Sequence, residues 1–308
     1  MATPQAPSRM SAPIDARQVR RLFADPASVA GSDFLRREIA SRMHDRLELV
    51  KIAPQRVLDA GCGAGADLLL LQKDYPAAQL IGIDAAAGMA AAARAPAPAL
   101  RSLNQMLGRL LPGKAAGLRP ADLLAGDFGN LPFAPNSIDL VWSNLALHWH
   151  PQPDRVFAEW RRVLRVDGLL MFSNFGPDTL RELRTAFAEV DEHPHVLPFV
   201  DMHDFGDQLV AAGFSTPVMD MELIKVTYDT AASLLADVRA LGGNPLATRA
   251  RGLRGRAAQQ RLLAALEKGR DATGKLVLSF EVIYGHAFRP APRTIASGES
   301  IVRFQAKP

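Results

Sequence analysis

Cysteine is almost absent from this sequence, since Cys62 is the only one among 308 residues. A single cysteine excludes an internal disulfide and a zinc site built from several cysteines, so we expect a reducing compartment, the cytoplasm. Long apolar runs are missing too: stretches such as 85–93 are far shorter than the roughly 18 residues that a membrane helix needs. Residues 1–13 contain no apolar segment typical of a signal peptide, and we interpret them as a flexible tail. We therefore expect no membrane partner.

A large charge excess is also lacking. The chain has 36 Lys and Arg against 32 Asp and Glu, a net charge of +4, which by itself does not indicate nucleic-acid binding. Hydrophobic residues make up 48% of the chain and charged residues 22%, which excludes a disordered or coiled-coil chain. The composition therefore predicts an ordinary globular protein of one large domain or two small ones.

Positive charge is concentrated in residues 249–275. This segment contains eight Lys and Arg but only two acidic residues, which gives it a local charge of +6. Such a segment could dock an acidic partner, or it could be the solvated face of a helix. It contains no Phe, Tyr or Trp on which the bases of a single-stranded nucleic acid could stack. We therefore expect no nucleic-acid partner.

Short apolar runs alternate with helical stretches along the middle of the chain, which predicts an α/β fold with a doubly wound, mostly parallel sheet. The predicted strands are 57–58, 80–83, 123–124, 138–142 and 169–172, followed by an antiparallel pair at 218–228 and 276–288. The predicted organisation is a tail over 1–13, an N-terminal helical cap over 14–50, a cofactor-binding core over 51–228, a basic helical lid over 229–275, and a last strand with a tail over 276–308. Residues 85–120 are predicted to be a second insertion.

The strongest chemical signal is the segment 56–66, an apolar strand that runs into a glycine turn and then a helix. Gly61, Gly63 and Gly65 let the backbone approach a ligand, and the N-terminus of the next helix offers free N–H groups to an anion. Taken alone, this pattern is also consistent with dinucleotide binding, because Asp84 stands where a ribose-binding acid is expected.

Two further acids argue against a nicotinamide cofactor. Asp59 ends the first predicted strand, where a carboxylate would repel a pyrophosphate but would suit the ammonium group of a methionine moiety. Asp127 follows the third strand, where it could accept a hydrogen bond from an adenine amino group.

Together, the motifs at 58–65, 83–84, 126–127 and 131–133 resemble those of class I S-adenosylmethionine methyltransferases. The resemblance implies S-adenosylmethionine as the cofactor, with Asp59 and the glycine turn at its methionine portion and Asp84 at the ribose hydroxyls. Asp127 and Phe128 would then lie at the adenine, and Asn144 belongs to the same predicted cofactor-binding set.

A narrower resemblance extends from about residue 17 to 304. Its motifs are 141–149, 159–165, 169–184, 199–204, 217–222 and 284–286, and they look like the malonyl-acyl-carrier-protein O-methyltransferase family of biotin synthesis. Two features depart from that family: the segment 23–34 lacks the usual tyrosine, and His148 stands where glutamine is common. A sister group with similar motifs comprises assembly factors that hydroxylate an arginine of respiratory complex I. A catalytically silent scaffold that binds S-adenosylmethionine is the third hypothesis.

The acceptor implied by the resemblance is the free carboxylate of a malonyl thioester, on acyl carrier protein or on coenzyme A. A carboxylate is already ionised at neutral pH and needs no general base, so no catalytic residue is named. His148 and Trp149 follow the fourth strand and are expected to line the substrate pocket, and Arg184 could clamp a carboxylate. The residues expected to dock the carrier are Arg249, Arg251 and Arg254.

The histidines and the nearby acids lack the spacing of a metal site, so no metal is expected. A serine hydrolase is disfavoured because the chain has no Gly-x-Ser-x-Gly turn.

Overall fold

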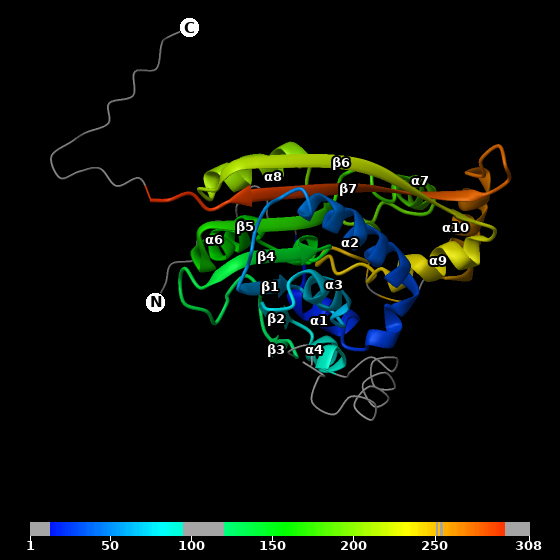
Figure 1. Ribbon diagram of the computed structural model, residues 1–308. Coiled ribbons are helices and arrows are strands. Elements are labelled where there is room, and N and C mark those ends of the chain that lie inside the picture. The colour runs from blue at the N-terminus through cyan, green and yellow to red at the C-terminus, as the bar shows by residue number, and fades with distance from the viewer. Residues whose placement is uncertain (1–12, 95–119, 251, 253–254, 293–308) are drawn as a thin grey trace, which may run out of the picture.

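A computed structural model describes residues 13–94, 120–250, 252 and 255–292 of the chain. Its centre is a seven-stranded sheet with the order β3-β2-β1-β4-β5-β7-β6 (Figure 1). The strands are β1 (Arg56–Ala60), β2 (Gln79–Asp84), β3 (Asp122–Ala125), β4 (Ile138–Asn144), β5 (Leu164–Phe175), β6 (Ser215–Tyr228) and β7 (Leu276–Phe288). The first five are parallel, whereas β7 is antiparallel to both β5 and β6. The predicted doubly wound sheet is confirmed, including its final antiparallel pair.

The parallel strands read as continuous apolar runs because helices cover both faces of the sheet. In the central strand β1, Leu58 lies between Ile81 of β2 and Val141 of β4, and all three side chains are buried. This register aligns the carboxyl ends of β1, β2 and β4, which end at Ala60, Asp84 and Asn144. Ligands of such sheets bind at this edge.

On one face, α2 (Asp33–Leu47) packs against β4, β5 and α3 (Ala66–Asp74). On the other face lie α6 (Pro153–Val163) and α8 (Met202–Ala211), which pack against each other (Figure 1). The buried stripe of α6 has helical spacing, with Val156, Phe157, Trp160 and Val163 all fully buried. Burying each such side chain stabilises the fold by about 1.5–3 kcal/mol.

The N-terminal cap consists of α1 (Ala16–Leu22) and two short turns of 3-10 helix, η1 (Pro26–Ser28) and η2 (Ala30–Ser32). Helix α1 begins after Asp15, whose carboxylate accepts hydrogen bonds from the N–H groups of Arg17 and Gln18. The next helix after β2 is α4 (Ala87–Arg94). Residues 1–12 of the predicted tail and residues 95–119 of the predicted insertion lie outside the described residues, as do residues 293–308.

Two lid helices, α9 (Ala231–Ala240) and α10 (Arg256–Lys268), lie between β6 and β7 in the chain. Helix α9 packs against α10 and against both strands, and α10 also packs against α7 (Arg181–Ala188) at one end of the sheet (Figure 1). The helical character predicted for this insertion is therefore present in the structure.

The cap and the lid are joined directly. The N–H of Asp15 donates to the carbonyl oxygen of Pro245 at 2.9 Å, and the N–H of Ala247 donates to that of Pro13 at 2.7 Å. Further along the cap, the Ser32 hydroxyl donates to the carbonyl oxygen of Ala240 at 2.8 Å, at the end of α9. We call this set of contacts the cap–lid pairing, and it spans the edge of the sheet where the ligands of such folds bind.

Candidate active site

A cavity of about 170 Å³ lies at the carboxyl ends of β1, β2 and β4 and extends under the cap. Its glycine turn brings the backbone close to neighbouring atoms. Gly61 has φ of +87°, and a side chain there would place its Cβ 2.3 Å from the Cβ of Ala146, so only glycine fits. The N–H of Gly63 donates to Asp84 Oδ2 at 3.0 Å, which ties the turn to the end of β2.

Four aspartates line this cavity, and Asp33 is paired with Arg36. The other three, Asp59, Asp67 and Asp84, stand at the ends of β1 and β2 and in the first turn of α3. Asp59 is 1% exposed, and its Oδ2 is buried without a hydrogen-bond partner among the described residues. Burial raises the pKa of Asp59 well above its ordinary value, and the charges of Asp67 and Asp84 raise it further. Burial likewise raises the pKa of Asp67 and of Asp84. The cavity is therefore a site that attracts a cation.

These residues fit S-adenosylmethionine, which carries an ammonium group and a positively charged sulfur. The unpartnered Oδ2 of Asp59 can accept a hydrogen bond from the ammonium group. Asp84 is held by the N–H groups of Gly63 and Ala86, at 3.0 and 2.8 Å, and its remaining lone pairs can accept from ribose hydroxyls. Phe128 is buried and supplies an apolar wall for an adenine ring.

Sequence reasoning missed Asp67 and three arginines of the cap and α2. Asp67 stands in the first turn of α3, where an acid is common for helix stability alone, and it accepts a hydrogen bond from Trp142 Nε1 at 2.9 Å. Arg20 of the cap and Arg36 and Arg37 of α2 line the same cavity and can balance the carboxylate of a methionine moiety. No motif marks them in the sequence, because they reach the site only through the fold.

Arg36 contacts three parts of the molecule. It donates through Nη1 to the carbonyl oxygen of Val29 and to Asp33 Oδ1, both at 3.0 Å, and through Nη2 to the carbonyl oxygen of Ala240 at 3.2 Å. Burial lowers its pKa. Asn144, a predicted cofactor residue that lines the cavity, donates through Nδ2 to the carbonyl oxygen of Arg36 at 3.1 Å.

Two predicted cofactor residues stand at the margin. Gly65 is not part of the cavity wall, and with φ of +82° it turns the chain into α3. The Asp127 side chain is 58% exposed and does not line the cavity, although its neighbour Phe128 does. A hydrogen bond from His150 lowers the pKa of Asp127, so its exposed carboxylate is ionised at neutral pH. Cys62 is buried, and burial raises the pKa of its thiol, so it packs in the turn.

A second cavity, of about 270 Å³, lies beyond Trp149, and we call it the acceptor cavity. Trp149 also lines the first cavity, so its indole ring lies between the two. The ring meets Phe23 of the cap edge to face, with centroids 5.1 Å apart. The walls are mostly apolar and include Phe175, Phe187, Phe199, Phe280, Leu180, Leu183, Leu197, Leu235, Val238 and Leu241.

His148 lines this cavity next to Trp149, and its role at the substrate stays a prediction. Its Nδ1 lies 2.7 Å from Asn174 Oδ1, and its ring packs against Phe175 and Phe199. Burial lowers the pKa of His148 to about 4. The imidazole is therefore neutral at physiological pH and offers a hydrogen bond rather than a charge.

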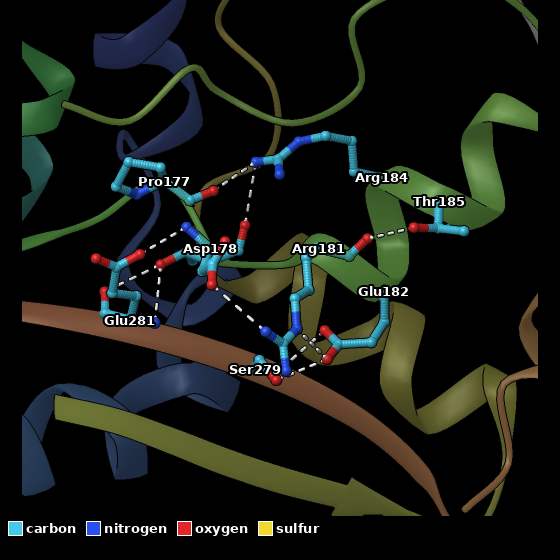
Figure 2. Close-up of polar contacts among 9 residues, drawn as sticks. Pro177, Asp178, Arg181, Glu182, Arg184, Thr185, Ser279 and Glu281 are labelled. Carbon is cyan, nitrogen blue, oxygen red and sulfur yellow. Dashed lines mark hydrogen bonds and ion pairs between the residues drawn. The ribbon is translucent and has the colours of Figure 1, made fainter. Parts of the chain in front are cut away.

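Arg184 is not part of the wall of either cavity. Figure 2 shows its side chain directed from α7 toward the Pro177 carbonyl, and Nη2 donates to the carbonyl oxygens of Pro177 and Thr179 at 3.1 and 3.3 Å. Nearby, Glu182 accepts hydrogen bonds from the N–H and hydroxyl of Ser279, at 2.9 and 2.6 Å (Figure 2). Glu281 accepts one from the N–H of Asp178 at 2.7 Å. This network fixes α7 on β7 and so positions the side of the acceptor cavity that α7 provides.

The basic segment is only partly available to a partner. Lys268 pairs with Glu189 at 2.6 Å, Arg270 pairs with Glu267 at 2.6 Å, and Lys275 pairs with Asp229. Arg249, one of the predicted docking residues, donates to the carbonyl oxygen of Leu246 at 2.8 Å. The other two, Arg251 and Arg254, lie outside the described residues.

Over the described ranges, no cluster of three or more His, Cys, Asp or Glu side chains is arranged to hold a metal ion. Within the same part of the chain, no helix is long and apolar enough to cross a membrane.

Residues 58–172 match a family model described as a methyltransferase domain. Among solved structures, the fold is similar to a putative methyltransferase from Bacillus halodurans, with a TM-score of 0.55 and 16% identity over 82% of this chain and 100% of that one. It is also similar to the YcgJ protein of Bacillus subtilis, with a TM-score of 0.54 and 17% identity over 81% and 98%. At these identities the similarity concerns the fold.

Two relatives with much higher sequence identity are both named malonyl-acyl-carrier-protein O-methyltransferase. The protein from Laribacter hongkongensis is 48% identical over 88% of this chain and 89% of its own length. The protein from Gallionella capsiferriformans is 45% identical over 96% of this chain and 98% of its own. With its methyltransferase fold and this level of identity over nearly its whole length, the chain belongs to the malonyl-acyl-carrier-protein O-methyltransferase family.

Proposed function

We propose that the protein transfers a methyl group from S-adenosylmethionine to the free carboxylate of a malonyl thioester carried by acyl carrier protein. The observation that supports this most is the junction at Trp149, where an acid-lined cavity meets an apolar one. The names of the relatives favour this function over an arginine hydroxylase and over a silent scaffold.

S-adenosylmethionine supplies, when bound, an electrophilic methyl group on a positively charged sulfur. The residues of this chain bind and orient it: Asp59 holds the ammonium group and Asp84 the ribose. Asp127 accepts from the adenine amino group beside Phe128. Arg36 contributes positive charge at the methionine carboxylate.

The acceptor carboxylate has an ordinary pKa near 4, so it is ionised at neutral pH and no side chain must remove a proton. The protein must place one carboxylate oxygen in line with the methyl group. It must also exclude the water that would lower the nucleophilicity of that oxygen. The apolar wall beside Trp149 serves this exclusion. His148, held neutral by burial, orients the acceptor without pairing with its charge.

Methyl transfer is tested with the full chain, S-adenosylmethionine and malonyl-carrier protein, with the ester detected by mass spectrometry. We expect one methyl ester per malonyl group and rescue of a biotin auxotroph that lacks its own malonyl methyltransferase. Asp59→Asn should lose both, because it removes the carboxylate that faces the ammonium group. Binding of S-adenosylmethionine without methylation of any malonyl thioester would contradict the proposal.

The carrier is proposed to dock at the start of the basic segment 249–275, at Arg249, Arg251 and Arg254. Acyl carrier proteins are acidic, and the cations at 268, 270 and 275 already have acidic partners. Exposed charges act mainly on the rate of encounter and are screened over about 10 Å at 0.1 M salt.

Replacing all three docking arginines by Glu should therefore raise KM for malonyl-carrier protein severalfold, and added salt should do the same to the unmodified protein. Steady-state kinetics with malonyl-coenzyme A gives the comparison, where both effects should be small. Arg155→Glu, on α6, is a control for a general change in charge. An equal loss on both substrates would remove the docking role.

A further inference from the structure

Apart from the indole of Trp149, the polar side chains that line the acceptor cavity fall into two groups. Four of them have partners within the protein. Thr179 donates to the carbonyl oxygen of Glu281, Asn244 to that of Pro194, and His195 lies 2.8 Å from Asp191. The fourth is His148, which is bonded to Asn174. These four groups therefore serve the wall itself.

The second group consists of Arg239 and Gln259. Both line the cavity, and neither side chain has a hydrogen bond or an ion pair with any of the described residues. Arg239 stands in the last turn of α9 and is exposed, and Gln259 stands in the first half of α10. Since α9 packs against α10, the two lid helices bring an unpaired cation and an unpaired amide to the rim of one apolar cavity.

The acids around Arg239 are engaged elsewhere. Asp237, on the same helix, is hydrogen-bonded to Tyr228, and Asp191 interacts with His195. Arg256, one turn before Gln259 on α10, is exposed and adds positive charge on the same side of that helix. The rim therefore favours an anion, whereas the interior favours a neutral chain.

We propose that Arg239, with Gln259, binds the phosphate of the 4′-phosphopantetheine arm that carries the malonyl group. This inference rests on the proposed function, because it concerns the arm of the same substrate. The arm matches the cavity chemically: its amide chain is neutral, and its single anionic group lies at the end far from the thioester. The same arm occurs on carrier protein and in coenzyme A, so the shared chemistry is its phosphate.

Exposure decides between the two anionic ends of this substrate. The malonyl carboxylate must be stripped of water beside Trp149, and an arginine bound to it would reduce its nucleophilicity. Arg239 is exposed, so it can hold a phosphate that keeps part of its hydration. A guanidinium is suited to this because its planar N–H groups match two phosphate oxygens.

The test compares malonyl thioesters of pantetheine and of 4′-phosphopantetheine, which differ only in the phosphate, and malonyl-carrier protein. In the unmodified protein the phosphate should raise kcat/KM by roughly fivefold, the effect of one partly exposed charged contact. Arg239→Gln should abolish that gain and leave the value for malonyl-pantetheine unchanged. Arg239→Lys should restore part of the gain. Arg261→Gln, in the same lid but outside the cavity wall, should keep all of it.

Calorimetric binding of 4′-phosphopantetheine and of pantetheine to the protein loaded with S-adenosylhomocysteine gives a second readout that needs no turnover. Arg239→Gln should reduce the affinity for the first to that for the second. An equal loss on all three substrates would overturn the inference and assign Arg239 to the malonyl carboxylate. An unchanged phosphate effect in Arg239→Gln would overturn it as well. If the unmodified protein binds 4′-phosphopantetheine more tightly than pantetheine but methylates no malonyl thioester, the result would instead contradict the proposed function.

Discussion

The two cavities are built on opposite principles. The first cavity, which we call the cofactor cavity, gathers Asp59, Asp67 and Asp84 within a few residues of the glycine turn and the neighbouring strand end, and burial raises the pKa of all three. The acceptor cavity is mostly apolar and is assembled from segments far apart in the chain, from Trp149 to Phe280. The first cavity is suited to a cationic ligand because of its acids, whereas the apolar walls of the second would exclude water. The difference shows where each class of mutation should act.

The largest effect should come from removing a cofactor carboxylate. Asp84→Ala deletes a charged acceptor for the ribose hydroxyls and also releases the N–H groups of Gly63 and Ala86. We expect a loss of about 1.5–3 kcal/mol in the binding of S-adenosylhomocysteine, measured by calorimetry. Asp207→Ala, an exposed acid on α8, is the control and should bind normally. Tight binding of NAD by the unmodified protein would refute the assignment of this cavity.

The acceptor side should respond separately. His148→Ala is expected to lower kcat for malonyl-carrier protein by about tenfold and to leave the affinity for S-adenosylhomocysteine within about twofold. Because burial holds its pKa at about 4, His148 should contribute no inflection near neutral pH to the rate profile. His148→Gln keeps a hydrogen-bonding group and tests whether lost packing alone explains the loss. Unchanged turnover in His148→Ala would make the residue purely structural.

The smallest expected effect is the pH dependence of stability and of cofactor binding. Since burial raises the pKa values of Asp59, Asp67 and Asp84, these carboxyls hold protons in the free protein at pH values where they would be ionised in the unfolded chain. The free fold should therefore lose stability as the pH rises through the raised values. A bound cation favours the ionised forms, so cofactor binding should release protons and strengthen with rising pH.

Calorimetry in buffers with different ionisation heats measures this release, and melting curves measure the stabilisation. We expect protons to be released on binding, with fewer released by Asp59→Asn. The rise in melting temperature on adding the cofactor should be greater at pH 8 than at pH 5. An affinity independent of pH from 5 to 8 would show that the three acids are already ionised in the free protein.

The same contrast explains what the sequence could predict. The glycine turn, Asp59 and Asp84 stand at the ends of consecutive strands, and a parallel sheet brings such ends together whatever the rest of the fold does. Phe128 and Asn144 follow the same rule and also line the cofactor cavity. Local order along the chain was therefore enough for most of this cavity.

No such rule predicts which residues of a covering helix reach a site. Arg36 and Arg184 both stand on helices among other charged residues. Only their tertiary contacts distinguish the role of one from that of the other. Arg36 lines the cofactor cavity, whereas Arg184 holds the loop before α7. The sequence does not predict the position of Arg239 either, because nothing in the sequence of its helix distinguishes a residue at the cavity rim from a solvated one.

The cap–lid pairing has a consequence for how the protein is made. Asp15 finds its partner at Pro245, and at about 5–20 residues per second the ribosome reaches that partner roughly 10–50 seconds later. During this interval the glycine turn and the first five strands are complete, but the cap lacks its hydrogen bonds to residues 240–247. We expect nascent chains that end before residue 240 to bind the cofactor weakly, so that methylation competence arises only when nearly the whole chain has left the ribosome.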